Sequence, residues 1–226
     1  ERGNFYSHDE AKLDLNDTAG LAEKGRNIID RIDSMSVKID DVRLSQARTK
    51  AENAASIDSR YITGKEEVQE AYSELNEAQK ILKHVKEDHG KEINQIELDE
   101  CIEDFNSLVS QYADSSEAAS FNNLSKTAQR SINDSSFDGY LDEMREKISR
   151  ILWRQDWFVI DEFKQITRNP NNYHDRNKFE DLRKRGMTCI KDNKIDELRR
   201  ICGELFRNMK TVSTEDKRLA VNIIKG

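Results

Sequence analysis

The stretch Ile-Leu-Trp-Arg-Gln-Asp-Trp-Phe-Val-Ile-Asp-Glu-Phe, residues 151–163, contains both tryptophans of the chain. The remainder is polar, because 36% of the 226 residues are charged and only 35% are hydrophobic. Since a large exposed apolar patch is a liability for a protein in water, this stretch predicts the centre of a helical core. A docking surface is the second interpretation, and a ligand or cofactor box is the third. The candidate core or protein-interaction residues are Trp153, Trp157, Phe158 and Phe163.

The composition indicates an all-α protein. The chain has one proline and nine glycines, whereas strand-rich folds use more of both in their turns. The high charge content suits helices that each bury one apolar stripe. We therefore expect an elongated, mostly antiparallel helical bundle with one long central helix and a C-terminal helical hairpin.

The apolar periodicity also predicts where the helices lie and how the domains divide. Residues 1–16 are expected to be a connector from an upstream domain, 17–112 the N-terminal helices with the long helix, and 113–226 a C-terminal helical bundle. The expected helices cover residues 17–35, 36–57, 65–112, 115–132, 137–167, 176–191, 195–209 and 211–226. The helix over 65–112 is either continuous or broken at Gly90, because glycine costs about 1 kcal/mol in a helix interior.

Two of these helices carry specific expectations. On one uninterrupted helix over 137–167, Trp153 and Trp157 are four residues apart and therefore share a face. We accordingly expect Trp157→Ala to unfold the C-terminal part of the chain. The stripe from Val68 to Val85 has the spacing of a coiled-coil seam, so a structural scaffold that dimerises through the long helix is the alternative function.

The residue inventory indicates no catalytic, cofactor or metal site. The sequence contains no glycine-rich phosphate loop and no His-Glu-x-x-His motif. The three cysteines are widely spaced, and no histidine lies near them at ligand spacing. We therefore expect small buried or half-buried residues of a reducing compartment, which predicts the cytoplasm, with a disulfide or metal role as the alternative. We expect no enzymatic activity from this chain.

The charge distribution bears on partners. The chain carries a net charge of −7, which argues against nucleic acid as the main partner. Residues 175–226 are basic, however, and Arg183, Lys184 and Arg185 are a candidate contact with an acidic surface, with a solvated helix face as the favoured alternative. No apolar run approaches the roughly 18 residues that a membrane span needs.

Several stretches carry a resemblance to a known family. Residues 152–159 (Leu-Trp-Arg-Gln-Asp-Trp-Phe-Val), 91–99 (Lys-Glu-Ile-Asn-Gln-Ile-Glu-Leu-Asp), 116–132 and 192–199 resemble segments in the C-terminal helical region of a bacterial branch of the DnaK-like, seventy-kilodalton heat-shock chaperones. The resemblance covers residues 91–199 and extends more loosely to about residue 20.

That resemblance implies a function. In such chaperones an N-terminal ATPase domain is followed by a β-sandwich that binds peptides and then by helices that form a lid or appendage. The resemblance implies that this chain is the helical appendage, acting in protein–protein interaction as a lid or regulator. Its implied partners are the upstream ATPase and substrate-binding domains, unfolded client proteins or a cochaperone. Because the chain begins at Glu1 rather than Met, we expect a fragment of a larger protein.

Overall fold

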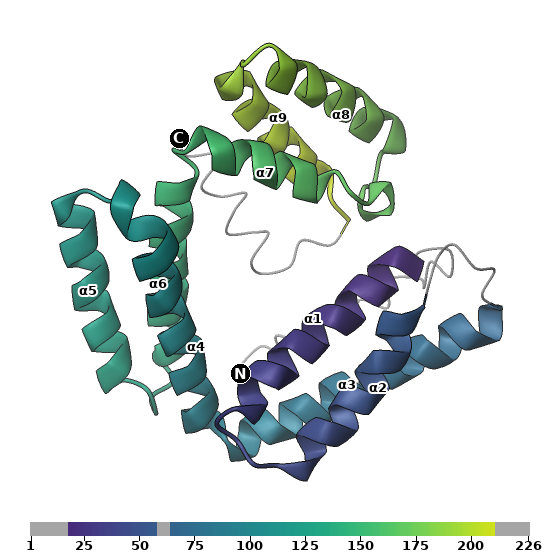
Figure 1. Ribbon diagram of the computed structural model, residues 1–226, viewed down its shortest axis with the longest axis vertical. Coiled ribbons are helices and arrows are strands. Elements are labelled where there is room, and N and C mark those ends of the chain that lie inside the picture. The colour runs from purple at the N-terminus through teal and green to yellow at the C-terminus, as the bar shows by residue number, and fades with distance from the viewer. Residues whose placement is uncertain (1–17, 58–63, 211–226) are drawn as a thin grey trace, which may run out of the picture. The chain divides into compact units, whose positions relative to one another are not determined.

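The computed structural model describes residues 18–57 and 64–210, and within them every regular element is a helix or helical turn (Figure 1). The expected all-α fold is therefore confirmed. The connector over 1–16, most of the turn over 61–64 and the helix over 211–226 lie outside the described residues. The chain divides into two compact units at Glu87/Asp88.

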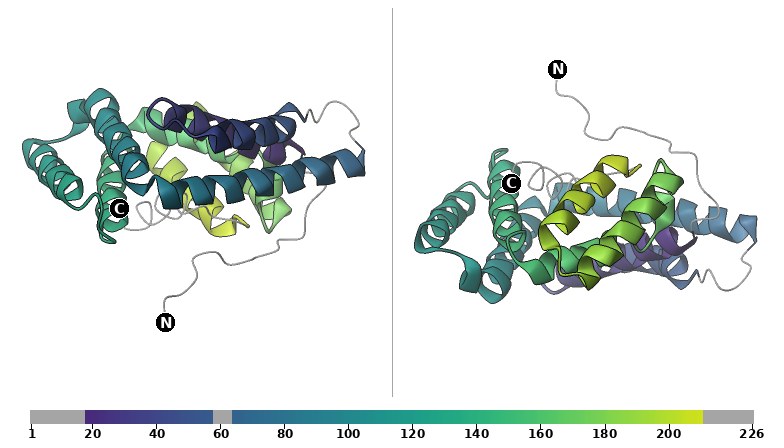
Figure 2. Two further views of the ribbon diagram at one scale, coloured as in Figure 1. Left: turned by 90° about the horizontal axis from the view of Figure 1, so that it is seen from below. Right: turned by 90° about the horizontal axis from the view of Figure 1, so that it is seen from above.

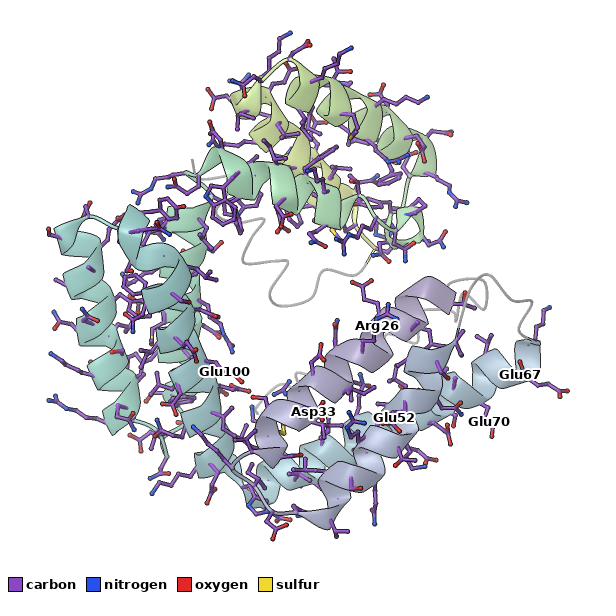
Figure 3. All side chains as sticks on the ribbon, viewed as in Figure 1. Arg26, Asp33, Glu52, Glu67, Glu70 and Glu100 are labelled. Carbon is purple, nitrogen blue, oxygen red and sulfur yellow. The ribbon has the colours of Figure 1, made fainter. Side chains whose placement is uncertain are left out.

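The first unit contains α1 (Thr18–Ser36), α2 (Val42–Ser56) and most of α3 (Lys65–Asp88). α1 and α2 approach so closely that a Cβ built on Gly25 would lie 2.6 Å from the backbone nitrogen of Ala55. Arg48 on α2 reinforces the pair by contacting Asp33 on α1 and Glu52 on its own helix, two carboxylates that are labelled in Figure 3. Glycine at position 25 thus permits this close helix contact, because it has no Cβ.

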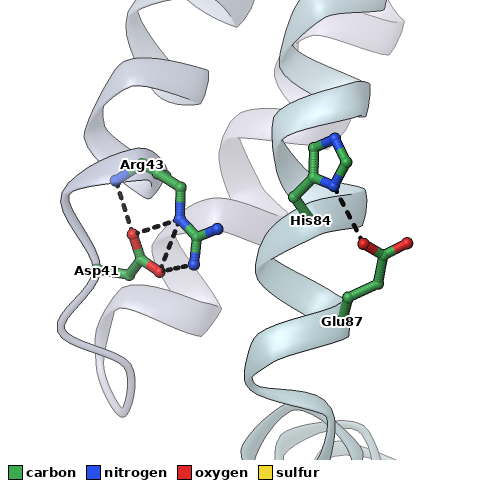
Figure 4. Close-up of polar contacts among 4 residues, drawn as sticks. All are labelled: Asp41, Arg43, His84 and Glu87. Carbon is green, nitrogen blue, oxygen red and sulfur yellow. Dashed lines mark hydrogen bonds and ion pairs between the residues drawn. The ribbon is translucent and has the colours of Figure 1, made fainter.

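The second helix begins later than its sequence pattern predicted. It was expected from residue 36, but α1 continues to Ser36 and α2 starts at Val42. The physical reason is the cap: the Asp41 carboxylate accepts a hydrogen bond from the Arg43 backbone N–H at 2.9 Å and also binds the Arg43 guanidinium (Figure 4). A capping aspartate satisfies a donor that the first turn of a helix leaves unpaired.

The stretch over 65–112 is not one long helix. α3 ends at Asp88, α4 runs from Gly90 to Asp104, and a π-helical turn (Phe105–Val109) and a 3₁₀ turn (Ser110–Tyr112) follow. The break expected as one alternative at Gly90 is therefore observed, and the longest helix among the described residues is α3, with 24 residues.

The second unit contains two hydrophobic clusters. The first cluster is formed by α4, the π-helical turn, α5 (Ser115–Arg130) and α6 (Phe137–Leu152), with Phe105 and Phe121 stacked at 3.9 Å between ring centroids. Because α4 packs with α5 and α6, it belongs to this unit, and the division at Glu87/Asp88 precedes the domain boundary expected after residue 112. The expected restart near residue 115 is confirmed: Asp114 and Glu117 form a reciprocal capping box at the start of α5.

The second cluster is formed by α7 (Asp156–Ile166), α8 (Arg176–Lys191) and α9 (Ile195–Asn208). α8 and α9 form the expected helical hairpin and run side by side (Figures 1 and 2). Asn193 turns the chain with a positive φ of 54°, a conformation that asparagine tolerates better than most residues. At the open end, the buried Asn208 side chain bonds both the N–H and the C=O of Asp175.

Candidate protein-interaction surface at the α6–α7 joint

The structure separates the two tryptophans. α6 ends at Leu152 and α7 begins at Asp156, with Gln155 extended between them, so the single helix expected over 137–167 is wrong. Trp153 is 6% exposed and belongs to the second cluster, whereas Trp157 is 48% exposed in the first turn of α7. We call residues 153–155 the joint.

The other two candidate aromatic residues also differ from each other. Phe163 is fully buried, and its ring lies against Gly186 of α8. Phe158 is half-buried and packs against both clusters of the unit. Its ring meets that of Trp153 edge to face at 5.3 Å between centroids, a favourable aromatic arrangement. Phe158 therefore links the two clusters, while Phe163 is core.

Trp157 is the exposed member of a small aromatic group in which Tyr112 and Phe158 are half-buried. Its ring lies 5.8 Å from that of Phe158 and 6.3 Å from that of Tyr112, measured between centroids. Tyr112 comes from the 3₁₀ turn that follows the π-helical turn. We call Tyr112, Trp157 and Phe158 the joint surface. Its chemistry is that of an apolar contact site with polar edges, because indole and phenol rings each carry one hydrogen-bonding group.

Arg154 fixes one side of this surface. Its guanidinium donates to both carboxylate oxygens of Glu117, at 2.9 and 2.8 Å, and to the backbone oxygen of Tyr112 at 3.4 Å. The hydrogen bond from Arg154, helped by the one from the Asp114 backbone N–H, holds the pKa of Glu117 below its usual value. The joint is thereby tied to the start of α5 by a two-pronged ion pair, the geometry in which arginine binds carboxylates best.

Arg199 of α9 fixes the other side. Its guanidinium donates to the backbone oxygens of Trp153 and Arg154, at 3.1 and 3.2 Å, and to the Asp156 carboxylate at 2.9 Å. The last carbonyls of a helix lack hydrogen-bond donors within the helix. Arg199 supplies such donors to the carbonyls that follow the end of α6. Sequence reasoning missed this residue, because its spacing from the joint contains no local signal.

Residues from the four stretches 91–99, 116–132, 152–159 and 192–199 meet in this unit. Glu117, Arg154 and Arg199 come from three of them, and each contacts another or the joint. The fourth, on α4, pairs with α5 through reciprocal amide bonds between Gln95 and Gln129. Asn94 also donates to the backbone oxygen of Ile132 at 2.8 Å. Four stretches that are separate in sequence therefore belong to one hydrogen-bonded framework.

The basic residues lie elsewhere in the unit. Arg183, Lys184 and Arg185 are all exposed on α8, and among the described residues the ion pairs of the two arginines stay within that helix rather than reaching the joint surface. Arg183 and Arg185 each form one weak pair with an acidic residue of the same helix, at 3.6 Å.

The coiled-coil seam on α3 is largely covered within the chain. Val68, Leu75 and Ala78 are 4% exposed or less. Asn53 of α2 donates to Glu74 of α3, and Lys50 pairs with Glu77. These residues are therefore not available on the surface for a second chain without opening the unit.

The three cysteines are buried and unpaired, as the sequence predicted. Burial raises the pKa of Cys101 to about 11 and raises the pKa values of Cys189 and Cys202 as well. Thiols in that state are poor nucleophiles, because the reactive species is the thiolate. His84 is exposed and contacts Glu87 at 3.1 Å (Figure 4).

Within 18–57 and 64–210, no group of three or more His, Cys, Asp or Glu side chains is placed to hold a metal ion. No helix in this part of the chain is both long and apolar enough to cross a membrane. Comparison with known proteins found no matching family model, no matching curated protein and no matching solved structure.

Proposed function

We propose that this chain is the C-terminal helical region of a cytoplasmic DnaK-like chaperone and acts through protein–protein contacts rather than catalysis. The observation that carries the proposal is the exposed indole of Trp157, which is held at the joint by ordered neighbours but contributes little to either core. Exposed aromatic residues on a fixed support are the usual anchors of protein interfaces. The resemblance over residues 91–199 supports the chaperone assignment.

The proposed partner is a segment with apolar side chains, supplied by an unfolded client. The joint surface offers three aromatic groups beside Arg154, and Arg154 is positioned by Glu117. Aromatic rings contribute large contact areas at a small entropic cost, since they have only two side-chain torsions. A lid or regulatory role toward the upstream domains would use the same kind of contact.

The test is a titration of fluorescein-labelled, reduced and carboxymethylated lactalbumin, a permanently unfolded polypeptide, followed by anisotropy. We expect saturable binding that Trp157→Ser weakens by about tenfold, the effect of losing a central aromatic anchor. Val37→Ser is the matched control, because Val37 is also an exposed apolar residue, at 82%, but lies in the α1–α2 loop. Equal binding by the wild type and Trp157→Ser would contradict the proposed surface.

Tryptophan emission gives a second readout. In Trp153→Phe the only remaining indole is Trp157, and its emission should shift to the blue when the polypeptide binds. In Trp157→Phe the remaining Trp153 is buried, so its emission should be blue-shifted at the start and should not respond. A response from Trp153 alone would place the contact elsewhere.

Two further measurements separate this proposal from its alternatives. Calorimetric titration with ATP should give no binding heat, and a saturable heat would contradict the non-enzymatic assignment. Light scattering at tens of micromolar should give the mass of one chain. A dimer would favour the scaffold alternative, although the buried residues of the α3 seam argue against it.

A further inference from the structure

The helix α8 is strongly basic within an acidic protein. Its 16 residues include six lysines and arginines against one glutamate and one aspartate, a net charge of +4. Because the whole chain carries −7, everything outside α8 carries −11. A helix of this charge attracts anionic groups over a distance comparable to the Debye length, about 8–10 Å at moderate salt.

The inner face of α8 is fixed in place. Phe179 and Leu182 are 1% exposed in the second cluster, and Gly186 lies directly against the ring of Phe163. The Asp175 carboxylate caps the helix by accepting from the Lys178 N–H at 2.9 Å. The outward side chains are therefore displayed on a rigid support, which lowers the entropic cost of binding a partner.

The outward face combines one apolar side chain with unpaired positive charge. Met187 is 56% exposed. Lys184 precedes it by three residues and Lys191 follows it by four, so all three lie on one side of the helix. Neither lysine has a carboxylate within ion-pair distance among the described residues, whereas the neighbouring Arg183 and Arg185 each have one at 3.6 Å.

We propose that the face formed by Lys184, Met187 and Lys191 binds an acidic peptide segment with an apolar side chain between two carboxylates. Seven helical residues separate the lysines by about 10 Å along the axis. Side chains on one face of an extended peptide recur at every second residue, so positions i and i+4 share a face and lie about 13 Å apart. Because lysine side chains are long and flexible, carboxylates at positions i and i+4 can each meet one lysine, with the apolar side chain at i+2 between them. The intervening apolar side chain then covers Met187, whose flexible thioether adapts to varied shapes.

Peptide fits this face better than the other anionic macromolecules. A nucleic acid gains nothing from an exposed methionine between the lysines, because its affinity comes from phosphate contacts and base edges. A membrane surface requires a broad apolar stripe beside the basic one, and Met187 is the only large exposed apolar residue of α8 within its described surface. This inference extends the interaction role proposed above to a second surface, on a different helix from Trp157.

The test is an anisotropy titration of the intact chain against the labelled octapeptide Gly-Glu-Ser-Leu-Ser-Asp-Gly-Ser, in which the two carboxylates and the leucine share one face when the peptide is extended. We expect binding that weakens as salt rises and that Lys184→Gln/Lys191→Gln reduces by about fivefold or more, as expected for two lost charge contacts. Met187→Ser should weaken binding by a similar factor. The matched control is Lys126→Gln/Arg130→Gln on α5, which removes two exposed charges from the same unit and should leave binding unchanged.

Three results would overturn this proposal. The wild type does not bind the octapeptide, or Lys184→Gln/Lys191→Gln binds it as tightly as the wild type does, or the α5 control loses as much affinity as that double variant. Tighter binding of a duplex DNA oligonucleotide or of anionic phospholipid vesicles than of the octapeptide would assign the face to those ligands instead. Binding of unfolded lactalbumin depends on Trp157 in the function proposed above, so the two proposals can fail separately.

Discussion

At the scale of single residues, the two tryptophans have different roles despite their identical chemistry. Trp153 closes α6 and enters the core of the second cluster, and Trp157 stays half-exposed on α7. The expectation that Trp157→Ala unfolds the C-terminal part assigned the core role to the wrong tryptophan. The error arose because spacing along one helix was assumed, whereas the chain leaves helical geometry between them.

The corrected expectation concerns both tryptophans. Trp153→Ala should lower the free energy of unfolding by about 3–5 kcal/mol, the usual cost of removing a buried aromatic ring. Trp157→Ala should cost about 1 kcal/mol or less, because half of that side chain is already in water. Urea denaturation followed by circular dichroism measures both. Trp153→Phe is the control: the Trp153 Nε1–H donates no hydrogen bond within the described structure, so little beyond part of the ring is lost.

Gly186 makes a second residue-scale prediction. A Cβ at this position would lie 2.2 Å from a ring carbon of the fully buried Phe163. Gly186→Ala should therefore destabilise the protein by about 1–3 kcal/mol, although alanine favours helix formation. The comparison is Gly139→Ala on α6, where no atom lies within 4 Å of the added Cβ. If both variants melt at the same temperature, α7 and α8 do not pack as described.

At the scale of elements, two arginines hold the α6–α7 joint from opposite sides. Arg154 reaches the start of α5, and Arg199 reaches the end of α6 from α9. Each guanidinium donates to a backbone carbonyl at the end of a helical turn, Tyr112 for Arg154 and Trp153 for Arg199. The joint is thus fixed although neither arginine is buried. The break between α6 and α7 is thus stabilised by residues up to 46 positions away in sequence.

Arg199 predicts a loss of stability when its donors are removed. Arg199→Met keeps most of the apolar stem but removes the donors to the Trp153 and Arg154 carbonyls. We expect a loss of about 1–3 kcal/mol in the free energy of unfolding, the range for hydrogen bonds from charged groups. Arg200→Met, on the exposed face of the same helix, should have almost no effect. Thermal denaturation of the two variants compares them directly, and equal melting temperatures would refute the role of Arg199.

Glu117 predicts a pH dependence at the same joint. Its folded-state pKa lies below the usual 4.5 because Arg154 and the Asp114 N–H stabilise the carboxylate. The associated stability is therefore present above about pH 4.5 and is lost as the pH falls through the lowered pKa. Glu117→Gln should remove this contribution, so its stability should fall less steeply than that of the wild type on acidification. Denaturation midpoints measured across that range test the sign.

At the scale of the whole molecule, the second unit has a hydrophobic core of its own. Both hydrophobic clusters described above consist only of residues after Asp88, and α1 and α2 pair within the first unit. A fragment spanning residues 88–226 should therefore fold alone and keep the near-ultraviolet circular dichroism of the tryptophans seen in the full chain. Loss of that signal would show that the second unit depends on the first.

Much of the secondary structure follows from the sequence itself. The apolar periodicity predicted the positions of α1, α3, α5, α8 and α9. The sequence also predicted the Asp114–Glu117 cap and the hairpin turn. These features are predictable because they depend on residues within one helical turn of each other. The all-α class followed from the composition, because a chain with one proline and nine glycines has few of the turn residues that strand-rich folds need.

Only the tertiary structure decided the rest. The end of α6 at Leu152, the burial of Trp153 rather than Trp157 and the hold of Arg199 on the joint all depend on contacts between distant segments. Local periodicity contains no information about which side of an apolar stretch meets a partner helix. A helix ends where packing and hydrogen bonds from elsewhere outweigh the small propensity of each residue to continue it, typically below 1 kcal/mol.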